Sequence, residues 1–301
     1  MNRRDILYLY SMRKFLQYSF YPGVILFTLF GSIYAMGILP NTQWIYIPGA
    51  FSLFFAVFFW RMEKVIPYRK DWLESQKDIP SDIARTFLTL PLASKIAEII
   101  LPSLLFYPAV WLTQFTKIHL YHNNMPLILA FFITLLVAEF FYYWMHRISH
   151  TLPFLWRFHA IHHGAPRIYW ANAGRFHFFD AFLGGFAYLL PIILLGAPNS
   201  IILLIITFSA VTGFLEHVNI DFKAGWLNYI FNTAQLHRWH HSEQIKESNS
   251  NYGKALIIWD LVFNSFYFPK KKKVNQVGIE GDLIPNGFWK QGWHPYKKKN
   301  K

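Results

Sequence analysis

The run Leu127–Met145 is almost wholly apolar, with Glu139 as its only charged residue, and a histidine-rich segment follows it directly. Such a run is typical of a helix that crosses a membrane, because a crossing takes about 20 residues. The chain is 54% hydrophobic and 20% aromatic, and only 15% of its residues are charged. That proportion predicts apolar side chains facing lipid as well as a core. We therefore predict an integral membrane protein, an all-α, polytopic transmembrane helical bundle.

Histidines are concentrated where this apolar run ends. Five of them fall within eighteen residues, as HRISH and then HAIHH. Residues three or four apart share a helical face, so each motif directs its imidazoles one way, and Pro153 between the motifs starts a new helix. A second H-x-x-H-H motif lies further along. Neutral imidazole binds iron, zinc, copper or nickel, and eight histidines are too many for one metal but suit two. The eight are His146, His150, His159, His162, His163, His237, His240 and His241.

The apolar runs and the basic loops together predict the topology. The runs are 19–39, 44–60, 92–115, 127–145, 181–195 and 200–215. The first is too long for a cleaved signal peptide, so we expect it to be retained. The basic stretch Arg61–Arg85 belongs in the cytoplasm by the positive-inside rule. If the histidine motifs are also cytoplasmic, run 92–115 must cross, and the loop with His119 and His122 faces outward. The alternative is a re-entrant or interfacial segment at 92–115.

The last two apolar runs are each short for a crossing, but as a pair they return the chain to the side it left. This hairpin would bring His217 back to His163, so that the two halves of the site meet. Beyond Asn219 the chain is polar and aromatic up to a lysine-rich end, which predicts a cytosolic helical cap carrying the di-metal site. We expect the site and both termini on the cytoplasmic side. The expected regions are an N-terminal membrane region, 1–126, a histidine-bearing domain, 127–269, and a basic tail, 270–301.

Two further histidines and one carboxylate are candidates for the same site. His217 would join the eight as a metal ligand because the hairpin returns it there. His177 precedes an apolar run and would be either a ligand or a hydrogen-bond partner of one. Glu216 is adjacent to His217 and points elsewhere on that helix, which favours a supporting role over ligation.

Two polar residues are candidates for a supporting or catalytic role. Glu139 lies two helical turns before His146, inside the predicted membrane, where a carboxylate is a functional hypothesis by default. It would hydrogen-bond a ligating histidine or pair with an arginine. Asn251 would orient a ligand, or would simply form a turn before Gly253.

The formal net charge of +13 does not predict a nucleic-acid partner. The cations flank apolar runs and cluster in tails, as is typical beside anionic lipid headgroups, and no nucleic-acid-binding motif is present. The chain has no cysteine, which excludes disulfides, cysteine-ligated iron–sulfur centres and thiol catalysis. Arginines near the histidine motifs would meet lipid headgroups or an acidic redox partner, or would only set the topology. These are Arg157, Arg167, Arg175 and Arg238.

The motifs HRISH, WRFHAIHH, NAGRFH and LHRWHH, followed by NYG and Trp259-Asp260, resemble the fatty acid hydroxylase superfamily. The likeness is greatest to its bacterial sterol desaturase-like and alkylglycerol monooxygenase-like branch and covers roughly 127–269. It implies a cytosolic cap that holds a non-haem di-iron centre, with zinc as a possible substitute in a purified sample. It also implies O2-dependent oxidation of an unactivated lipid C–H bond. Residues 261–265 read Leu-Val-Phe-Asn-Ser where many relatives read Leu-Phe-Gly-Thr, a departure that touches no ligand.

By this resemblance the eight motif histidines, with His217 and His177, would hold two iron ions. The substrate would be a sterol, fatty acyl chain, sphingolipid or ether lipid, and the product an alcohol or an alkene. Because the chain shows no cluster or haem domain of its own, the electrons would come from a separate protein. Two alternatives stay open at this point: a metal-dependent membrane lipid enzyme of non-oxygenase chemistry, and a histidine-ligated haem- or metal-binding membrane protein.

Overall fold

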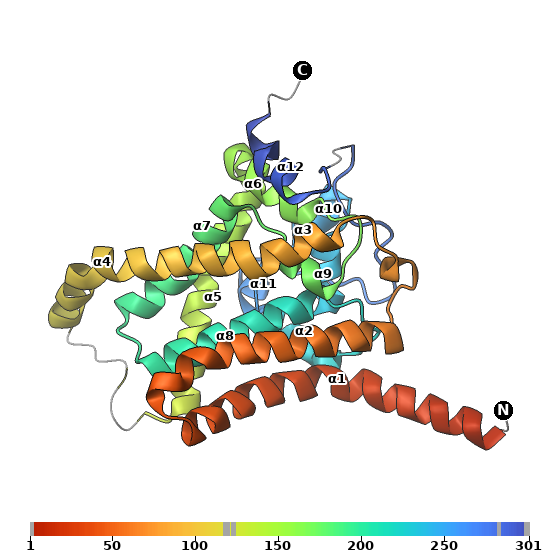
Figure 1. The fold of residues 1–301 in the computed structure, drawn as a ribbon, viewed down its shortest axis with the longest axis horizontal. Helices are drawn as coiled ribbons and strands as arrows, with labels where there is room; N and C mark the ends of the chain where they lie inside the picture. The colour runs from red at the N-terminus through yellow and green to blue at the C-terminus, as the bar shows by residue number, and fades with distance from the viewer. Residues whose placement is uncertain (1–2, 117–120, 122–124, 282–283, 298–301) are drawn as a thin grey trace.

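Helices provide the regular secondary structure of this protein (Figure 1). The computed structural model describes residues 3–116, 121, 125–281 and 284–297. Within these ranges the chain forms α-helices and short 3-10 or π turns, and β-structure is limited to isolated bridges. The prediction of an all-α fold is confirmed.

The first two apolar runs form a helical hairpin. Helix α1 (Arg3–Ile38) is joined to α2 (Ile47–Val65) through the 3-10 turn η1 (Asn41–Tyr46). In the turn, the Trp44 indole donates hydrogen bonds to the carbonyls of Met36 and Leu39, each at 3.1 Å, which satisfies carbonyls left free at the end of α1. Both helices pack against α8, the last long helix, which lies beside them in Figure 1.

The third apolar run is one continuous helix. The chain passes through η2 (Asp71–Leu73), α3 (Ile79–Ala84) and the π turn η3 (Arg85–Thr89) into α4 (Leu90–Thr116). Two prolines lie inside α4 without ending it. The helix is therefore long enough to cross a membrane, as the prediction requires. His119 and His122, expected on the outer loop that follows, lie outside the described residues.

The histidine motifs follow a helix break at the predicted place. Helix α5 (Leu127–Thr151) ends two residues before Pro153, and α6 (Pro153–His163) begins at that proline. Proline lacks an N–H group and clashes with the preceding turn, so it begins helices more readily than it continues them. After the turn η4 (Trp170–Gly174), the chain forms α7 (Phe178–Leu194) and α8 (Asn199–His217).

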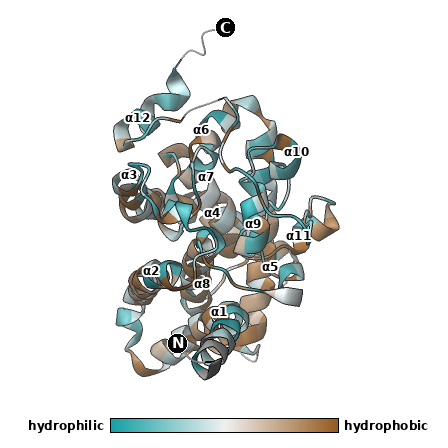
Figure 2. Ribbon diagram, turned by 90° about the vertical axis from the view of Figure 1, so that its right-hand side faces the viewer, coloured by the Kyte–Doolittle hydropathy of each residue, from teal (hydrophilic) through white to brown (hydrophobic). Residues whose placement is uncertain are grey.

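The remaining chain forms short elements at the end of the bundle that carries the histidines. Helix α9 packs on α8, and in Figure 2 α9, α10 and the near ends of α1 and α2 carry hydrophilic residues. These elements are η5 (Gly225–Tyr229), α9 (Ala234–His240), α10 (Ile245–Ser248), α11 (Ile258–Val262), α12 (Phe288–Trp293) and η6 (His294–Tyr296).

Five helical segments of the described chain are long and apolar enough to cross a membrane. The protein buries at most 33% of the most apolar stretch in the first three, against 67% in the last, Asn199–His217. Helix α8 is therefore central, while apolar side chains on the outer helices are left to face lipid. This arrangement confirms a multi-pass integral membrane protein. The segments are Tyr10–Ile38, Asn41–Val65, Ile79–Trp111, Leu127–Thr151 and Asn199–His217.

Three of the four arginines near the histidine motifs lie inside the protein, which contradicts the headgroup and redox-partner alternatives for them. Arg175 is fully buried and donates to Asp82 at 3.0 Å. Arg167 donates to both oxygens of Asp78, at 2.7 and 2.9 Å. Arg238 donates to two backbone carbonyls after α8. The two aspartates lie 93 and 89 residues away along the chain, so local charge patterns could not identify these partners.

Candidate metal centre

Nine histidines from α5, α6, α8 and α9 come together at one end of the bundle. They form two groups, and within each group one ring nitrogen per residue lies within 4.8 Å of the others. The eight motif histidines and His217 are all included. The first group is His146, His150, His159, His163 and His240, and the second is His162, His217, His237 and His241.

The H-x-x-H-H motifs divide between the two groups. On α6, His159 and His163 enter the first group, whereas His162 enters the second. On α9 the pattern is reversed: the outer two histidines enter the second group and the middle one enters the first. Residues four apart are rotated by only about 40° around a helix, whereas neighbouring residues are about 100° apart. The expectation that each motif aims at one point was therefore wrong, because each motif contributes to both groups.

The two groups adjoin. The ring centroids of His163 and His241, one from each group, are 4.4 Å apart and nearly parallel. The rings of His237 and His240 are 5.1 Å apart. This spacing makes a single compact centre with two subsites.

The hydrogen bonds of the first group leave unprotonated nitrogens facing each other. His146 Nδ1 lies 2.7 Å from the carbonyl of Tyr252, and His240 Nδ1 lies 2.7 Å from the carbonyl of Ser250. A carbonyl only accepts, so each Nδ1 carries the proton of its neutral ring and each Nε2 carries a lone pair. The two Nε2 atoms are 3.0 Å apart, and His159 Nε2 is 3.0 Å from that of His146. Facing lone pairs repel unless a cation lies between them, so these residues fit a metal ion.

The second group has the same arrangement. His217 Nδ1 lies 2.8 Å from the side-chain oxygen of Asn172, whose amide nitrogen donates to a backbone carbonyl. His217 Nε2 is therefore unprotonated, and it lies 2.9 Å from His237 Nε2. His241 Nε2 is 3.1 Å from Nε2 of both His237 and His162. Nitrogens about 2.1 Å from a shared metal lie roughly 3 Å apart when they are adjacent ligands.

Burial keeps these rings neutral. Burial, reinforced by the neighbouring imidazoles, lowers the pKa of His162, His163, His237, His240 and His241 well below the ordinary value of histidine. Removal from water disfavours the charged imidazolium, and so does a second positive charge nearby. Neutral imidazole is the form that binds a metal.

Three supporting groups were not identified from the sequence. Asp180 accepts from His159 Nδ1 at 2.9 Å, Asn172 accepts from His217, and Asn249 lies 3.2 Å from His150 Nδ1. The sequence held a signal for two of them, because Asn172 and Asp180 lie in or next to the NAGRFH motif. Partners of this kind fix the tautomer and orientation of a metal-binding ring.

Asp180→Ala is expected to weaken metal binding by about 10- to 100-fold, because His159 loses the acceptor that holds its ring in place. Titration of the metal against a competing chelator measures this affinity. Asp221→Ala is the control, since that carboxylate pairs with Arg13 and Gln17 and with no histidine. Equal affinities in the two variants would contradict the supporting role of Asp180.

His177 lies outside both groups. Its Nδ1 accepts a hydrogen bond from the backbone N–H of Phe179 at 3.1 Å, which caps the start of α7. Its Nε2 lies 3.2 Å from the carbonyl of Gly292. Both ring nitrogens are therefore engaged elsewhere, and we remove His177 from the proposed ligands.

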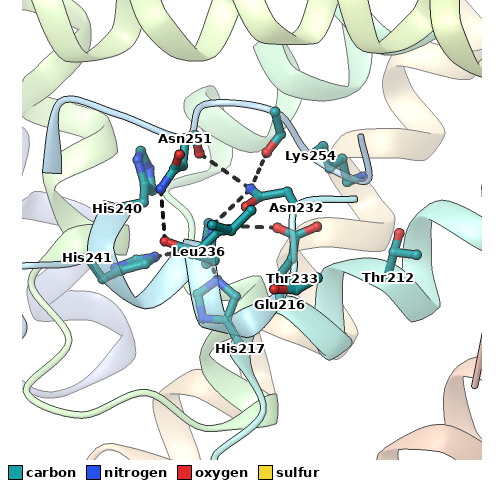
Figure 3. A network of polar contacts seen from close by, with 12 residues as sticks. Thr212, Glu216, His217, Asn232, Thr233, Leu236, His240, His241, Asn251 and Lys254 are labelled. Carbon is teal, nitrogen blue, oxygen red and sulfur yellow. Dashed lines mark hydrogen bonds and ion pairs between the residues drawn. The ribbon is translucent and has the colours of Figure 1, made fainter. Parts of the chain in front are cut away.

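Glu139 and Asn251 support the loop that follows α10 and contact none of the nine histidines. The Glu139 carboxylate accepts backbone N–H groups of residues 254–256 and the hydroxyl of Tyr188. Asn251 adopts a left-handed backbone with φ 54°, and its side chain bonds to the backbones of Leu236 and Tyr267 (Figure 3). This loop supplies the carbonyls that orient His146 and His240. Glu139 and Asn251 therefore act on the histidines indirectly, by holding the loop in place.

The NYG and Trp-Asp motifs complete this loop. Asp260 accepts the backbone N–H groups of Tyr252 and Gly253, at 2.8 and 2.7 Å, and burial raises its pKa to about 6. A Cβ atom at Gly253 would clash with the carbonyl oxygen of Leu256, so only glycine fits there. The two motifs therefore fix the backbone that holds the first histidine group.

An apolar cavity leads to the histidines. It has a volume of about 300 Å³ and is lined by residues of α4, α5, α7 and α8, with five of the histidines at one end. A second cavity of about 760 Å³ shares Lys95, Glu98, Leu189 and Ile206 with it and extends to the turn η1 and the first turn of α8. The two cavities adjoin at these four residues and together reach from the turn η1 to the histidine groups.

A multi-pass helical bundle that presents two histidine groups to an apolar cavity defines a class of membrane protein with a histidine-rich metal-binding site. The family model described as "Fatty acid hydroxylase" matches residues 131–265. The chain is 35% identical over 252 residues to the ornithine lipid hydroxylase OlsE of Rhizobium tropici, covering 79% of this chain and 72% of that one. The chain belongs to the fatty acid hydroxylase family.

Other relatives match a smaller part of the chain. The alkylglycerol monooxygenase of Xenopus tropicalis is 32% identical over 145 residues, which is 48% of this chain and 32% of that protein. The human alkylglycerol monooxygenase is 29% identical over 180 residues, 58% of this chain and 39% of that one. The chain thus spans about a third of the length of these monooxygenases. No solved structure matches the chain.

Proposed function

We propose that this protein is a non-haem di-iron oxygenase that hydroxylates a membrane lipid with O2 and with electrons from a separate protein. The observation that carries the proposal is the pair of adjoining histidine groups, five members of which line a largely apolar cavity. Membership of the fatty acid hydroxylase family supports it. Two similar proteins are named as a lipid hydroxylase and a monooxygenase, which favours an alcohol over an alkene as the product.

The protein would contribute to the reaction mainly by positioning the metal ions and the lipid chain and by excluding water. The nine histidines would hold two iron ions, which when bound would supply the redox chemistry that activates O2 toward an unactivated C–H bond. Asp180 and Asn172 would keep His159 and His217 in the tautomer that offers Nε2. The apolar cavity would bring the lipid chain to the centre and keep water away from it.

We extend the proposal to topology and regions. The metal centre and both termini would lie on the cytoplasmic side, where soluble electron donors are available. Residues 127–269 would be the catalytic domain, preceded by the membrane region 1–126 and followed by the basic tail 270–301. The basic loop Arg61–Arg85 supports this orientation.

Lipid mass spectrometry of a host with and without the gene, grown under ¹⁸O2, tests the reaction. The expected result is a lipid that is heavier by one hydroxyl oxygen and carries the label only when the protein is present. A product that takes its oxygen from water, or a change without added oxygen, would overturn the proposal and favour non-oxygenase chemistry.

Removal of the metal gives an independent check. Treatment of the purified protein with a strong chelator is expected to abolish O2-dependent product formation, because the histidines alone have no redox chemistry. Iron should restore it and zinc should not, although zinc fits the same nitrogens. Restoration by zinc would exclude a role for iron in oxygen activation.

A further inference from the structure

Two ionisable side chains line the cavity beside the histidines. Glu216, on the last turn of α8, and Lys254, in the loop after the NYG motif, both line the cavity together with His217 and His237. In Figure 3, Glu216 and Lys254 lie on one side of His217, His240 and His241. Asp180 also lines the cavity but already accepts from His159, and Lys95 and Glu98 pair with each other. The rest of the lining, apart from the histidines, is largely apolar or aromatic. A polar pair at this place needs an explanation, because charges in apolar surroundings are costly.

Glu216 has no hydrogen-bond donor among the described residues. It is only 5% exposed, and its closest basic atom is His237 Nδ1 at 3.7 Å, beyond hydrogen-bond distance. The contrast with Glu139 is informative, since that buried carboxylate accepts three backbone N–H groups and a hydroxyl. Glu216 is therefore a buried acceptor without a partner, facing the cavity that the lipid would enter.

The Lys254 ammonium also has hydrogen-bond donors that are not all used within the described chain. Its ammonium donates to the hydroxyl of Ser209, and it lies 4.9 Å from the centre of the Tyr188 ring. No ion pair within 4.0 Å joins it to a carboxylate of the described chain. Lys254 thus retains N–H groups that can donate into the cavity.

A plain hydrocarbon chain would leave both groups without partners. An ether or an ester offers acceptors to Lys254 but no donor to Glu216. A secondary amide offers both, because its N–H and its C=O point in opposite directions and can reach groups on two different segments. We propose that Glu216 and Lys254 form a subsite for a secondary amide of the lipid substrate, with the N–H bound by Glu216 and the C=O bound by Lys254.

This subsite would determine which carbon is oxidised. Glu216 Oε2 lies 3.7 Å from Nδ1 of His237, a member of the second histidine group, so an amide held there has its neighbouring carbons close to that group. The substrate would then be an N-acyl lipid oxidised within a few bonds of its amide, and not in the middle of a long chain. This statement about the oxidised carbon rests on the proposed function, whereas the subsite itself can be tested without turnover.

The test uses two probes of equal length, N-dodecylacetamide and dodecyl acetate, which differ only in an N–H group replaced by oxygen. Their dissociation constants are measured on the metal-loaded, full-length protein in detergent without reductant. The wild type is expected to bind the amide about tenfold more tightly, as one hydrogen bond to a charged group implies. In Glu216→Leu the amide and the ester should bind almost equally, because the acceptor of the N–H group is gone. Lys254→Met should weaken the binding of both probes and keep the preference, because both probes offer a C=O to Lys254.

Lys95→Met is the matched control, because it removes a lysine that lines the same cavity from α4 and pairs with Glu98. It should keep the tenfold preference. If Glu216→Leu does not fold, Glu216→Gln keeps an acceptor and should keep a reduced preference. Unchanged binding of both probes by Lys254→Met would overturn the role of Lys254. Equal binding of both probes by the wild type, or equal loss of preference in Lys95→Met, would overturn the subsite. Neither result depends on oxygen incorporation, so failure of the proposed function would be seen separately in the ¹⁸O2 experiment.

Discussion

His240→Ala is expected to lose bound iron and to lower hydroxylated product by more than about 100-fold, since even supporting residues of metal ligands contribute 10- to 100-fold. His240 is fully buried, and its Nε2 lies 3.0 Å from that of His146 in the first group. Alanine removes one of the five nitrogens of the first group. Iron analysis of the purified variant and lipid mass spectrometry measure the two effects.

His177→Ala is the matched control for this prediction. It also removes a histidine, but one whose nitrogens bond to the backbones of Phe179 and Gly292. Iron content and product should stay close to those of the wild type. An unchanged iron stoichiometry in His240→Ala would count against the ligand assignment, and loss of iron in His177→Ala would mean that the centre extends beyond the two groups.

Arg175→Ala is expected to lower the free energy of unfolding by about 3–5 kcal/mol, because it leaves the buried Asp82 carboxylate without its cation. The pair is fully buried, with a separation of 3.0 Å, and Arg175 also donates to the carbonyl of Ile161 on α6. Its loss would therefore loosen the segment that carries three of the histidines. Unfolding in detergent, followed by the loss of helical signal, measures the change.

The exposed pair Arg13–Asp221 provides the control for this second prediction. Arg13 is 57% exposed on its side chain, so Arg13→Ala should change the unfolding free energy by no more than about 1 kcal/mol. The double variant Asp82→Asn with Arg175→Ala should recover part of the loss, since no unpaired charge remains inside. Equal effects of Arg175→Ala and Arg13→Ala would show that the buried pair does not stabilise the fold.

The histidine ligands illustrate how far sequence reasoning reaches. The eight motif histidines and His217 were identified from their spacing and from the hairpin that returns the chain, and the structure brings all nine together. His177 was a candidate because it precedes an apolar run, yet it caps α7. A motif shows which residues are close in sequence, whereas the direction of one side chain depends on where its helix begins.

The long-range partners could not be predicted in the same way. The bonds of Asp82 to Arg175 and of Glu139 to residues 254–256 join segments that are about 90 to 120 residues apart. Glu216 and Lys254 line the same cavity, and this also depends on how α8 packs against the loop beyond the NYG motif. Such contacts depend on helix packing, so no periodic pattern in the sequence predicts them.

The amino-acid sequence by itself determined the membrane helices, the helix break at Pro153 and the identity of the nine imidazoles, because hydrophobic run length and helical periodicity are local properties of a chain. Only the tertiary structure decided how those imidazoles divide into two groups, which carboxylates and carbonyls hold their tautomers, and which charges reach the cavity. The reason is physical: a helix of 3.6 residues per turn sets the angle between neighbouring side chains, but the partner that each one meets is set by the packing of helices far apart in sequence.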